Sequence, residues 1–258
     1  MNNLERNVVC LKQGTGYTAE YVNVLYNSIT RNCTLDFNFV CITDNPTGIN
    51  PEIRIVPLPY TIAGGKWKDK LPGCWSKPYI FSPECPISGT VLYLDLDIVI
   101  ACNIDKLFTY APTKWCTIND FCPPNARMSR INSSVLRFQA KEMPYIWHNL
   151  LNNLDSIKHR LRGGGREDQA WIHEQAIDAG SPPCIYPDKW CLSWKLNIRK
   201  QKTLLTRGKS STSLTGPGHR STRSVENVIP PPECCACIFH GDPKPHACRD
   251  PWVIKNWY

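Results

Sequence analysis

Short apolar runs alternate with amphipathic segments along the first sixty residues of the chain. Residues 7–11, 37–43 and 53–57 are apolar runs of strand length, and residues 19–30 carry apolar side chains at the spacing of one helix face. A glycine-containing turn at residues 12–18 separates the first run from the helix. This order is typical of a nucleotide-binding protein, although the turn lacks the third glycine of the dinucleotide-binding sequence. The pattern predicts a βαββ unit and an α/β fold.

Residues 91–100 form the most unusual stretch, an apolar run of strand length that contains Asp95 and Asp97. A buried parallel strand is a near-continuous apolar run, and a bare carboxylate inside one costs several kcal/mol. Ligands of α/β sheets bind beyond the carboxyl ends of the strands. Two interpretations follow: a D-x-D site whose divalent cation holds a diphosphate, or a strand end with one capping and one solvated aspartate.

The alternation of strands and helices continues toward the end of the chain. Two further strands, at residues 115–120 and 131–138, precede a helix at residues 170–179. Between residues 199 and 232 the composition shifts to Ser, Thr, Gly, Lys and Arg, which predicts a flexible loop or insertion. We therefore expect one domain over residues 1–258 with this insertion inside it.

The composition and charge of the chain indicate which classes of ligand and partner to expect. The chain has 258 residues and a formal net charge of +8, which suits an anionic ligand such as a nucleotide or a phosphorylated acceptor. The basic residues form no long run, so no nucleic-acid partner is expected. The chain shows no signal peptide and no apolar stretch long enough to span a membrane. We expect a cytoplasmic protein and leave peripheral membrane contact open.

The fourteen cysteines are spread too thinly for a disulfide scaffold. Most stand singly in apolar runs, where a thiol behaves as a small hydrophobic group. A cluster at Cys234, Cys235 and Cys237 could suggest zinc, but its members crowd one strand, where neighbouring side chains point to opposite faces. Reduced, unligated thiols are therefore the favoured interpretation.

Three short segments together resemble a known family pattern. They are Asp-Leu-Asp at residues 95–97, Asn-Ser-Ser at residues 132–134 and His-Gly-Asp-Pro-Lys-Pro at residues 240–245. These segments resemble the motifs of GT-A nucleotide-sugar glycosyltransferases, and most of all the retaining family eight, which includes glycogenin and bacterial lipooligosaccharide galactosyltransferases. The resemblance covers most of the chain outside residues 199–232. It implies a Rossmann-like three-layer α/β/α fold with a mixed, mostly parallel central sheet.

The resemblance also implies roles for individual residues. Asp95, Asp97 and His240 would bind Mn²⁺ or Mg²⁺, leaving positions open for the two phosphates of a nucleoside diphosphate. Asp168 and Gln169 would act in catalysis beside the anomeric carbon. The residues that would contact the nucleotide are Leu11, Lys12, Tyr17, Lys77, Asp95, Leu96, Gly241 and Lys244. The residues that would contact the donor sugar are Lys77, Asn132, Ser133, Asp168 and Gln169.

The implied function is that of a metal-dependent glycosyltransferase of the hexosyltransferase type. It would move a sugar from a nucleotide-sugar, preferably a UDP-sugar, to a glycan, lipid-linked or protein acceptor with retention of configuration. A nucleotidyltransferase and a non-catalytic nucleotide- or glycan-binding relative remain as alternatives. Single residues also have plainer explanations: Asp168 can cap a helix, His240 can be a hydrogen-bonded strand-end histidine, and Lys195 can be a phosphate contact, an acceptor contact or a surface charge.

Overall fold

The computed structural model describes five stretches of the chain, which are residues 5–59, 73–121, 131–157, 168–199 and 229–258. The insertion expected at residues 199–232 falls almost entirely outside them. That insertion and the single domain over residues 1–258 therefore stay predictions.

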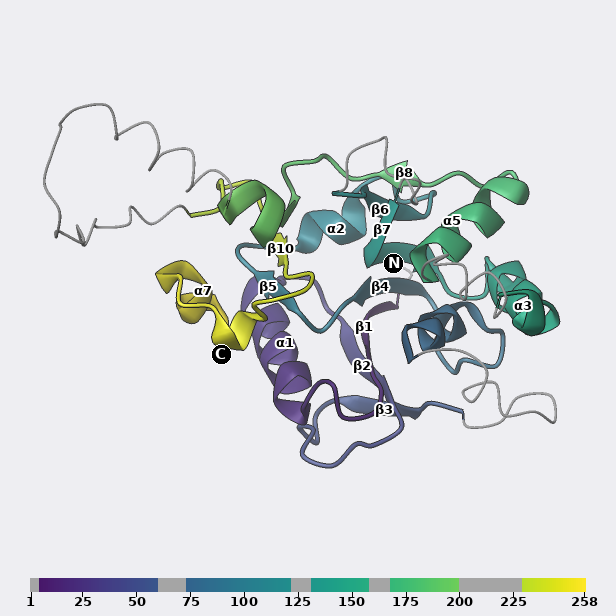
Figure 1. Ribbon diagram of the computed structural model, residues 1–258, viewed down its shortest axis with the longest axis horizontal. Helices are drawn as coiled ribbons and strands as arrows, with labels where there is room; N and C mark the ends of the chain where they lie inside the picture. Colours follow the sequence, from purple (N-terminus) through teal and green to yellow (C-terminus); the bar gives the residue numbers. More distant parts are fainter. Residues whose placement is uncertain (1–4, 60–72, 122–130, 158–167, 200–228) are drawn as a thin grey trace, which may run out of the picture.

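Seven strands form the central sheet. They are β1 (Arg6–Lys12), β2 (Asn38–Thr43), β3 (Arg54–Pro57), β4 (Thr90–Leu94), β6 (Cys116–Asn119), β7 (Ile131–Gln139) and β8 (Cys184–Ile185). Their order across the sheet is β3-β2-β1-β4-β7-β6-β8 (Figure 1). Neighbouring strands are parallel except where β7 pairs with β4 and β6, to which it is antiparallel. The mixed, mostly parallel sheet is therefore confirmed.

Helices cover both faces of this sheet. They are α1 (Ala19–Asn32), α2 (Asp105–Thr109), α3 (Pro144–Asn152) and α5 (Asp168–Asp178). A further helix, α7 (Pro251–Asn256), packs in a separate core with Val99 and Cys237. Figure 1 shows α1 on one side of the sheet, and α3 and α5 on the other. Successive strand residues point to opposite faces, so Val8 packs in the core beneath α1 and Val9 packs in the core beneath α3 and α5. The three-layer α/β/α arrangement is confirmed.

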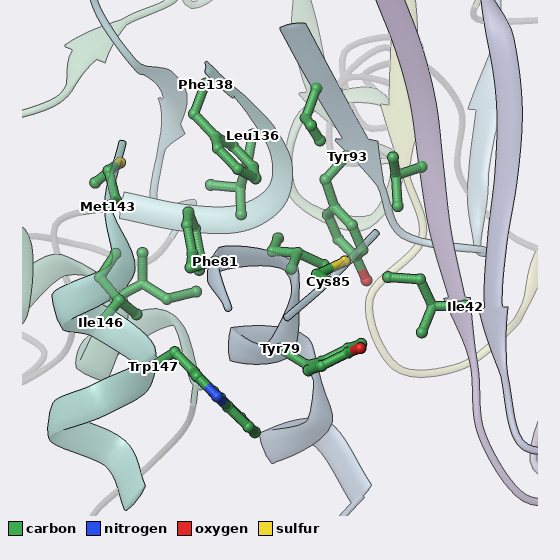
Figure 2. Packing of buried hydrophobic residues seen from close by; sticks show 14 of the residues in the cluster. Ile42, Tyr79, Phe81, Cys85, Tyr93, Leu136, Phe138, Met143, Ile146 and Trp147 are labelled. Atoms are coloured by element: carbon green, nitrogen blue, oxygen red, sulfur yellow. The ribbon is translucent and has the colours of Figure 1, made fainter. Parts of the chain in front are cut away.

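A short 3₁₀ helix, η2 (Gly73–Phe81), packs between α3 and the sheet. Figure 2 shows Tyr79 and Phe81 of η2 among the core residues of this face. The ring of Tyr79 lies 5.6 Å from that of Trp147 in α3, and the ring of Phe81 lies 4.5 Å from that of Phe138 in β7. These contacts fix the part of η2 that contains Lys77. Among the described helices, none has the length and apolarity to cross a membrane.

A second, three-stranded sheet consists of β5 (Ile98–Ile100), β9 (Cys191–Ser193) and β10 (Ala236–Ile238). The central strand β10 is antiparallel to β5 and parallel to β9. Residues 91–100 are therefore not one strand, as the sequence pattern suggested, but β4 and β5 in two different sheets. Asp95 and Asp97 lie in the turn between β4 and β5, so neither carboxylate belongs to a strand of either sheet.

Candidate active site

The carboxyl ends of the parallel strands meet the start of β7 at one edge of the central sheet. Strand β4 ends at Leu94, and the backbone N–H of Asp95 donates to the carbonyl of Ser134 at 3.0 Å. Because β7 is antiparallel to β4, its first residues, including Asn132 and Ser133, lie beside the Asp95 turn. Two of the three predicted motifs are thus neighbours in space.

Lys77 connects three segments of this edge. Its ammonium Nζ lies 3.0 Å from Asp95 Oδ1 and 3.1 Å from Asp168 Oδ2, and it donates to Ser133 Oγ at 2.9 Å. Burial alone would lower the pKa of Lys77, but the charges of Asp168 and Asp95 outweigh burial and raise that pKa. Lys77 therefore stays protonated and neutralises part of the carboxylate charge. Asp95 also accepts a hydrogen bond of 2.9 Å from the hydroxyl of Tyr93.

Asp97 faces a second lysine from the late motif. The ammonium of Lys244 lies 2.5 Å from Asp97 Oδ2, and the hydroxyl of Tyr17 donates to the same oxygen at 2.8 Å. Lys244 also donates to the Tyr17 hydroxyl at 2.9 Å. Burial and the charge of Asp95 raise the pKa of Asp97, while Lys244 opposes that shift. The predicted phosphate-binding lysine is therefore next to the D-x-D turn.

The segment before His240 pairs with this turn through the backbone, and the His240 ring contacts Ser193 and Phe121. The N–H of Phe239 donates to the carbonyl of Asp97 at 3.1 Å, so the end of the chain does fold back onto the D-x-D segment. The Nε2 atom of His240 forms a hydrogen bond of 2.6 Å with Ser193 Oγ. The imidazole stacks on the ring of Phe121, with a centroid distance of 5.8 Å. Burial and the charge of Lys195 lower the pKa of His240, which favours the neutral ring.

The predicted metal set fits a divalent cation only in part. In the described portion of the chain, no three His, Cys, Asp or Glu side chains are grouped as metal ligands. Asp95 and Asp97 supply oxygen donors of the kind that Mn²⁺ and Mg²⁺ prefer. The Nε2 atom of His240 is bonded to Ser193, so a metal would be bound through Nδ1, or through Nε2 after that bond is broken. The set of Asp95, Asp97 and His240 therefore stays a prediction.

The other predicted residues lie around these two lysine–carboxylate pairs. Lys12 is buried at the end of β1, where its ammonium donates to the carbonyl of Asn45 at 3.2 Å. Asn132 accepts a hydrogen bond of 2.9 Å from the backbone of Ser134. Gln169 follows the buried Asp168 in the first turn of α5. The remaining predicted residues are Leu11 at the end of β1, Leu96 in the D-x-D turn and Gly241 in the loop after β10.

Three solved structures with a similar arrangement of elements are glycosyltransferases. The galactosyltransferase LgtC, in complex with donor and acceptor sugar analogues, matches 96% of this chain and 93% of its own, with a TM-score of 0.59 and 13% identity. The glycosyltransferase GlyE of Streptococcus pneumoniae TIGR4 matches 98% of this chain and 61% of its own, with a TM-score of 0.60 and 12% identity. The chain has a GT-A-type glycosyltransferase fold.

The bifunctional glycosyltransferase WbbM shares this GT-A-type fold over 98% of the present chain and 51% of its own, with a TM-score of 0.52 and 12% identity. No protein-family model and no curated protein matches the sequence. At identities this low the likeness establishes the fold, and the chemistry has to be argued from the residues.

Two residues that contact the site, Tyr93 and Ser193, were not predicted from the sequence. Tyr93 lies in β4, two positions before Asp95. Because side chains two positions apart in a strand point to the same face, Tyr93 could have been predicted to lie beside Asp95. Ser193 holds His240 from a position 47 residues earlier in the chain. No local pattern marks Ser193, because its partner is set by the pairing of β9 with β10.

Proposed function

We propose that the protein is a metal-dependent glycosyltransferase that transfers a sugar from a nucleotide-sugar, preferably a UDP-sugar, to a glycan, lipid-linked or protein acceptor with retention. The observation that carries the proposal is the contact of one buried ammonium, Lys77 Nζ, with Asp95, Asp168 and Ser133. Asp95 and Ser133 come from two of the segments that resemble the glycosyltransferase pattern, and Asp168 is a residue to which that resemblance gives a catalytic role. The GT-A-type fold supports the same assignment.

Transfer requires that negative charge on the leaving diphosphate and positive charge at the anomeric carbon both be stabilised. Lys244 is the side chain available to the diphosphate, because its ammonium already lies at the D-x-D turn. A divalent cation bound by Asp95 and Asp97 would add Lewis-acid stabilisation of the same phosphates. The nucleoside would lie against Leu11, Lys12 and Tyr17, at the ends of β1 and the following turn.

Asp168 and Gln169 would face the anomeric carbon, and Asn132 and Ser133 would contact the donor sugar. The carboxylate of Asp168 is bound by Lys77 at 3.1 Å, and Ser133 Oγ donates to it at 3.4 Å. A carboxylate held this way is suited to stabilising a positive anomeric centre and is a weakened nucleophile. This favours attack of the acceptor on the front face, assisted by the leaving phosphate, over a double displacement.

A donor panel tests the proposal directly. The protein is incubated with Mn²⁺ and UDP-, GDP- or CMP-sugars, and released nucleotide is measured. We expect release from a UDP-sugar, its loss on chelation with EDTA, and a fall of about 100-fold or more for Asp97→Asn. Asp178→Asn, which removes an exposed carboxylate at the end of α5, serves as the control.

Different outcomes distinguish the alternatives. Release of pyrophosphate from a nucleoside triphosphate and a sugar phosphate would identify a nucleotidyltransferase. Binding of UDP without turnover of any donor would identify a non-catalytic relative. Absence of turnover, together with no Mn²⁺-dependent thermal shift in the presence of UDP, would rule out the proposed function.

A further inference from the structure

A third lysine, Lys195, lies at the rim of the site. It belongs to η3 (Trp194–Ile198), a short π-helical turn that follows β9, and its side chain is exposed. Its ammonium Nζ lies 3.6 Å from the position that a Cβ atom would take on Gly241. Lys195 therefore reaches over the loop that leads from His240 to Lys244.

The backbone around Lys195 is firmly held. Ser193 Oγ accepts a hydrogen bond of 3.1 Å from the N–H of Leu196, and the N–H of Ser193 donates to Asn197 Oδ1 at 2.8 Å. The preceding residue, Trp194, is buried and stacks on Phe239 at 5.1 Å. The base of the Lys195 side chain is thus fixed on both sides.

The ammonium of Lys195 has no carboxylate partner among the described residues, whereas the ammonium groups of Lys77 and Lys244 do. Lys77 and Lys244 each lie within 3.1 Å of a carboxylate. Within the described residues, the Lys195 ammonium forms neither a hydrogen bond nor an ion pair.

Transfer adds negative charge to the diphosphate, which a further cation at the rim of the site can stabilise. Asp95, Asp97 and Asp168 bring three negative charges, and the two lysines that contact them, Lys77 and Lys244, bring two positive charges. When the anomeric C–O bond of a donor breaks, its electron pair stays on the β-phosphate oxygen, so the diphosphate gains one negative charge. The acceptor oxygen forms the new bond to the anomeric carbon, and its proton passes to the departing phosphate oxygen and from there to solvent.

Gly241 lets the loop backbone come close to the Lys195 ammonium. Its φ of +74° is a conformation that favours glycine, and a Cβ atom on Gly241 would lie in van der Waals contact with Lys195 Nζ. An anion that binds at the exposed side of this loop would lie near Lys195 and in the same loop as Lys244.

We propose that Lys195 binds the diphosphate of the donor and stabilises the nucleoside diphosphate as it leaves. This inference rests on the proposed function, because it assigns a residue to the leaving group of that reaction. It goes beyond the predicted nucleotide-binding set, which has Lys244 as its phosphate-binding lysine.

Binding measurements on Lys195→Gln, Lys195→Arg and Lys189→Gln test the inference. Lys189→Gln removes an exposed charge from the turn before β9 and is the matched control. We expect Lys195→Gln to weaken UDP binding by roughly tenfold, the scale of one charge-assisted hydrogen bond, and to leave uridine binding unchanged. Lys195→Arg should keep most of the UDP affinity, and the control should keep all of it. The kcat/KM for the donor should fall in parallel with UDP affinity.

The outcomes separate this inference from the proposed function. If wild-type protein binds UDP and Lys195→Gln binds it equally well, the inference is wrong and the proposed function stands. A change confined to the KM of the acceptor would also overturn it and place Lys195 at the acceptor. If wild-type protein binds no nucleoside diphosphate, the proposed function fails and the inference fails with it.

Discussion

Lys77 is the residue on which the electrostatics of the site depend most. Its ammonium is buried between Asp95 and Asp168, and the charges of those carboxylates raise its pKa despite burial. A buried ion pair adds little net stability compared with apolar residues, but removal of one partner leaves an uncompensated charge. The stability of the protein should therefore respond to Lys77 and its partners as a unit.

We expect Lys77→Met to lower the free energy of unfolding by about 3 kcal/mol, because two carboxylates lose their buried cation. Urea unfolding at neutral pH measures the change. When Asp168→Asn is added to Lys77→Met, part of the lost free energy of unfolding should return, because one of the unpaired carboxylate charges is removed. Additive effects of the two substitutions would show that the side chains are not coupled.

Individual residues of the site were predictable where a short motif carried them. Asp95, Asp97 and Lys244 stand in two motifs, and the structure brings Asp97 and Lys244 together across 147 positions. The same motif reasoning gives His240 a metal-ligand role, which stays a prediction, whereas no motif indicated its contact with Ser193. A motif specifies which residues are present, whereas the direction of a side chain depends on partners elsewhere in the chain.

At the scale of elements, apolar runs predicted most strands but not their directions. Residues 131–138 look like any other buried strand, yet β7 is antiparallel to both its neighbours. Strand direction depends on how the chain returns to the sheet, and periodicity carries no record of that path. The division of residues 91–100 into β4 and β5 was not predicted either, because both halves are equally apolar.

The junction between α1 and α2 depends on one carboxylate. Asp105, in the first turn of α2, accepts a 2.9 Å hydrogen bond from the N–H of Thr34, just beyond the end of α1, and another from the Thr34 hydroxyl. Burial would raise the pKa of Asp105, but these bonds outweigh burial and lower it. Because the folded-state pKa is the lower one, the stabilisation is present above the unfolded value of about 3.9 and is lost as pH falls through the folded value.

Asp105→Asn should therefore cost stability in a pH-dependent way. We expect a loss of about 1 kcal/mol at pH 7, after discounting a partly exposed charge-assisted bond for solvent screening. The difference from wild type should narrow as the pH falls from about 5 toward 3. Urea unfolding across this range, with Asp178→Asn as the control, measures it. A difference that stays constant with pH would contradict the role of the ionised carboxylate.

The position of η2 depends on its aromatic core contacts. Phe81 is 1% exposed and lies against Phe138, on the face that Figure 2 shows. We expect Phe81→Ala to lower the free energy of unfolding by about 3 kcal/mol, from lost burial and the cavity left behind. Phe81→Leu refills much of that volume and should cost about half as much. Urea unfolding of the two variants provides the test, and equal losses would show that the site collapses around the smaller side chain.

At the scale of the whole molecule, the site joins two sheets. Asp95 follows β4 of the central sheet, whereas Lys244 follows β10 of the small sheet, which reaches the turn through β5. Figure 1 shows β10 beside β5 and α7 close to α1, so the end of the chain packs against its beginning. A ligand that contacts both lysine–carboxylate pairs would therefore couple the two sheets.

Hydrogen exchange can detect this coupling. With UDP and Mn²⁺, we expect slower amide exchange both at residues 93–98 and at residues 238–244, because the diphosphate contacts groups from both sheets and binding stabilises the regions it joins. Uridine lacks the phosphates, so we expect it to slow amide exchange only at the end of β1 and in the turn that follows. The amides of α3, on the far side of the η2 core, should exchange at the same rate in all samples. Protection by UDP that is restricted to the central sheet would separate Lys244 from the diphosphate and require a different phosphate-binding residue.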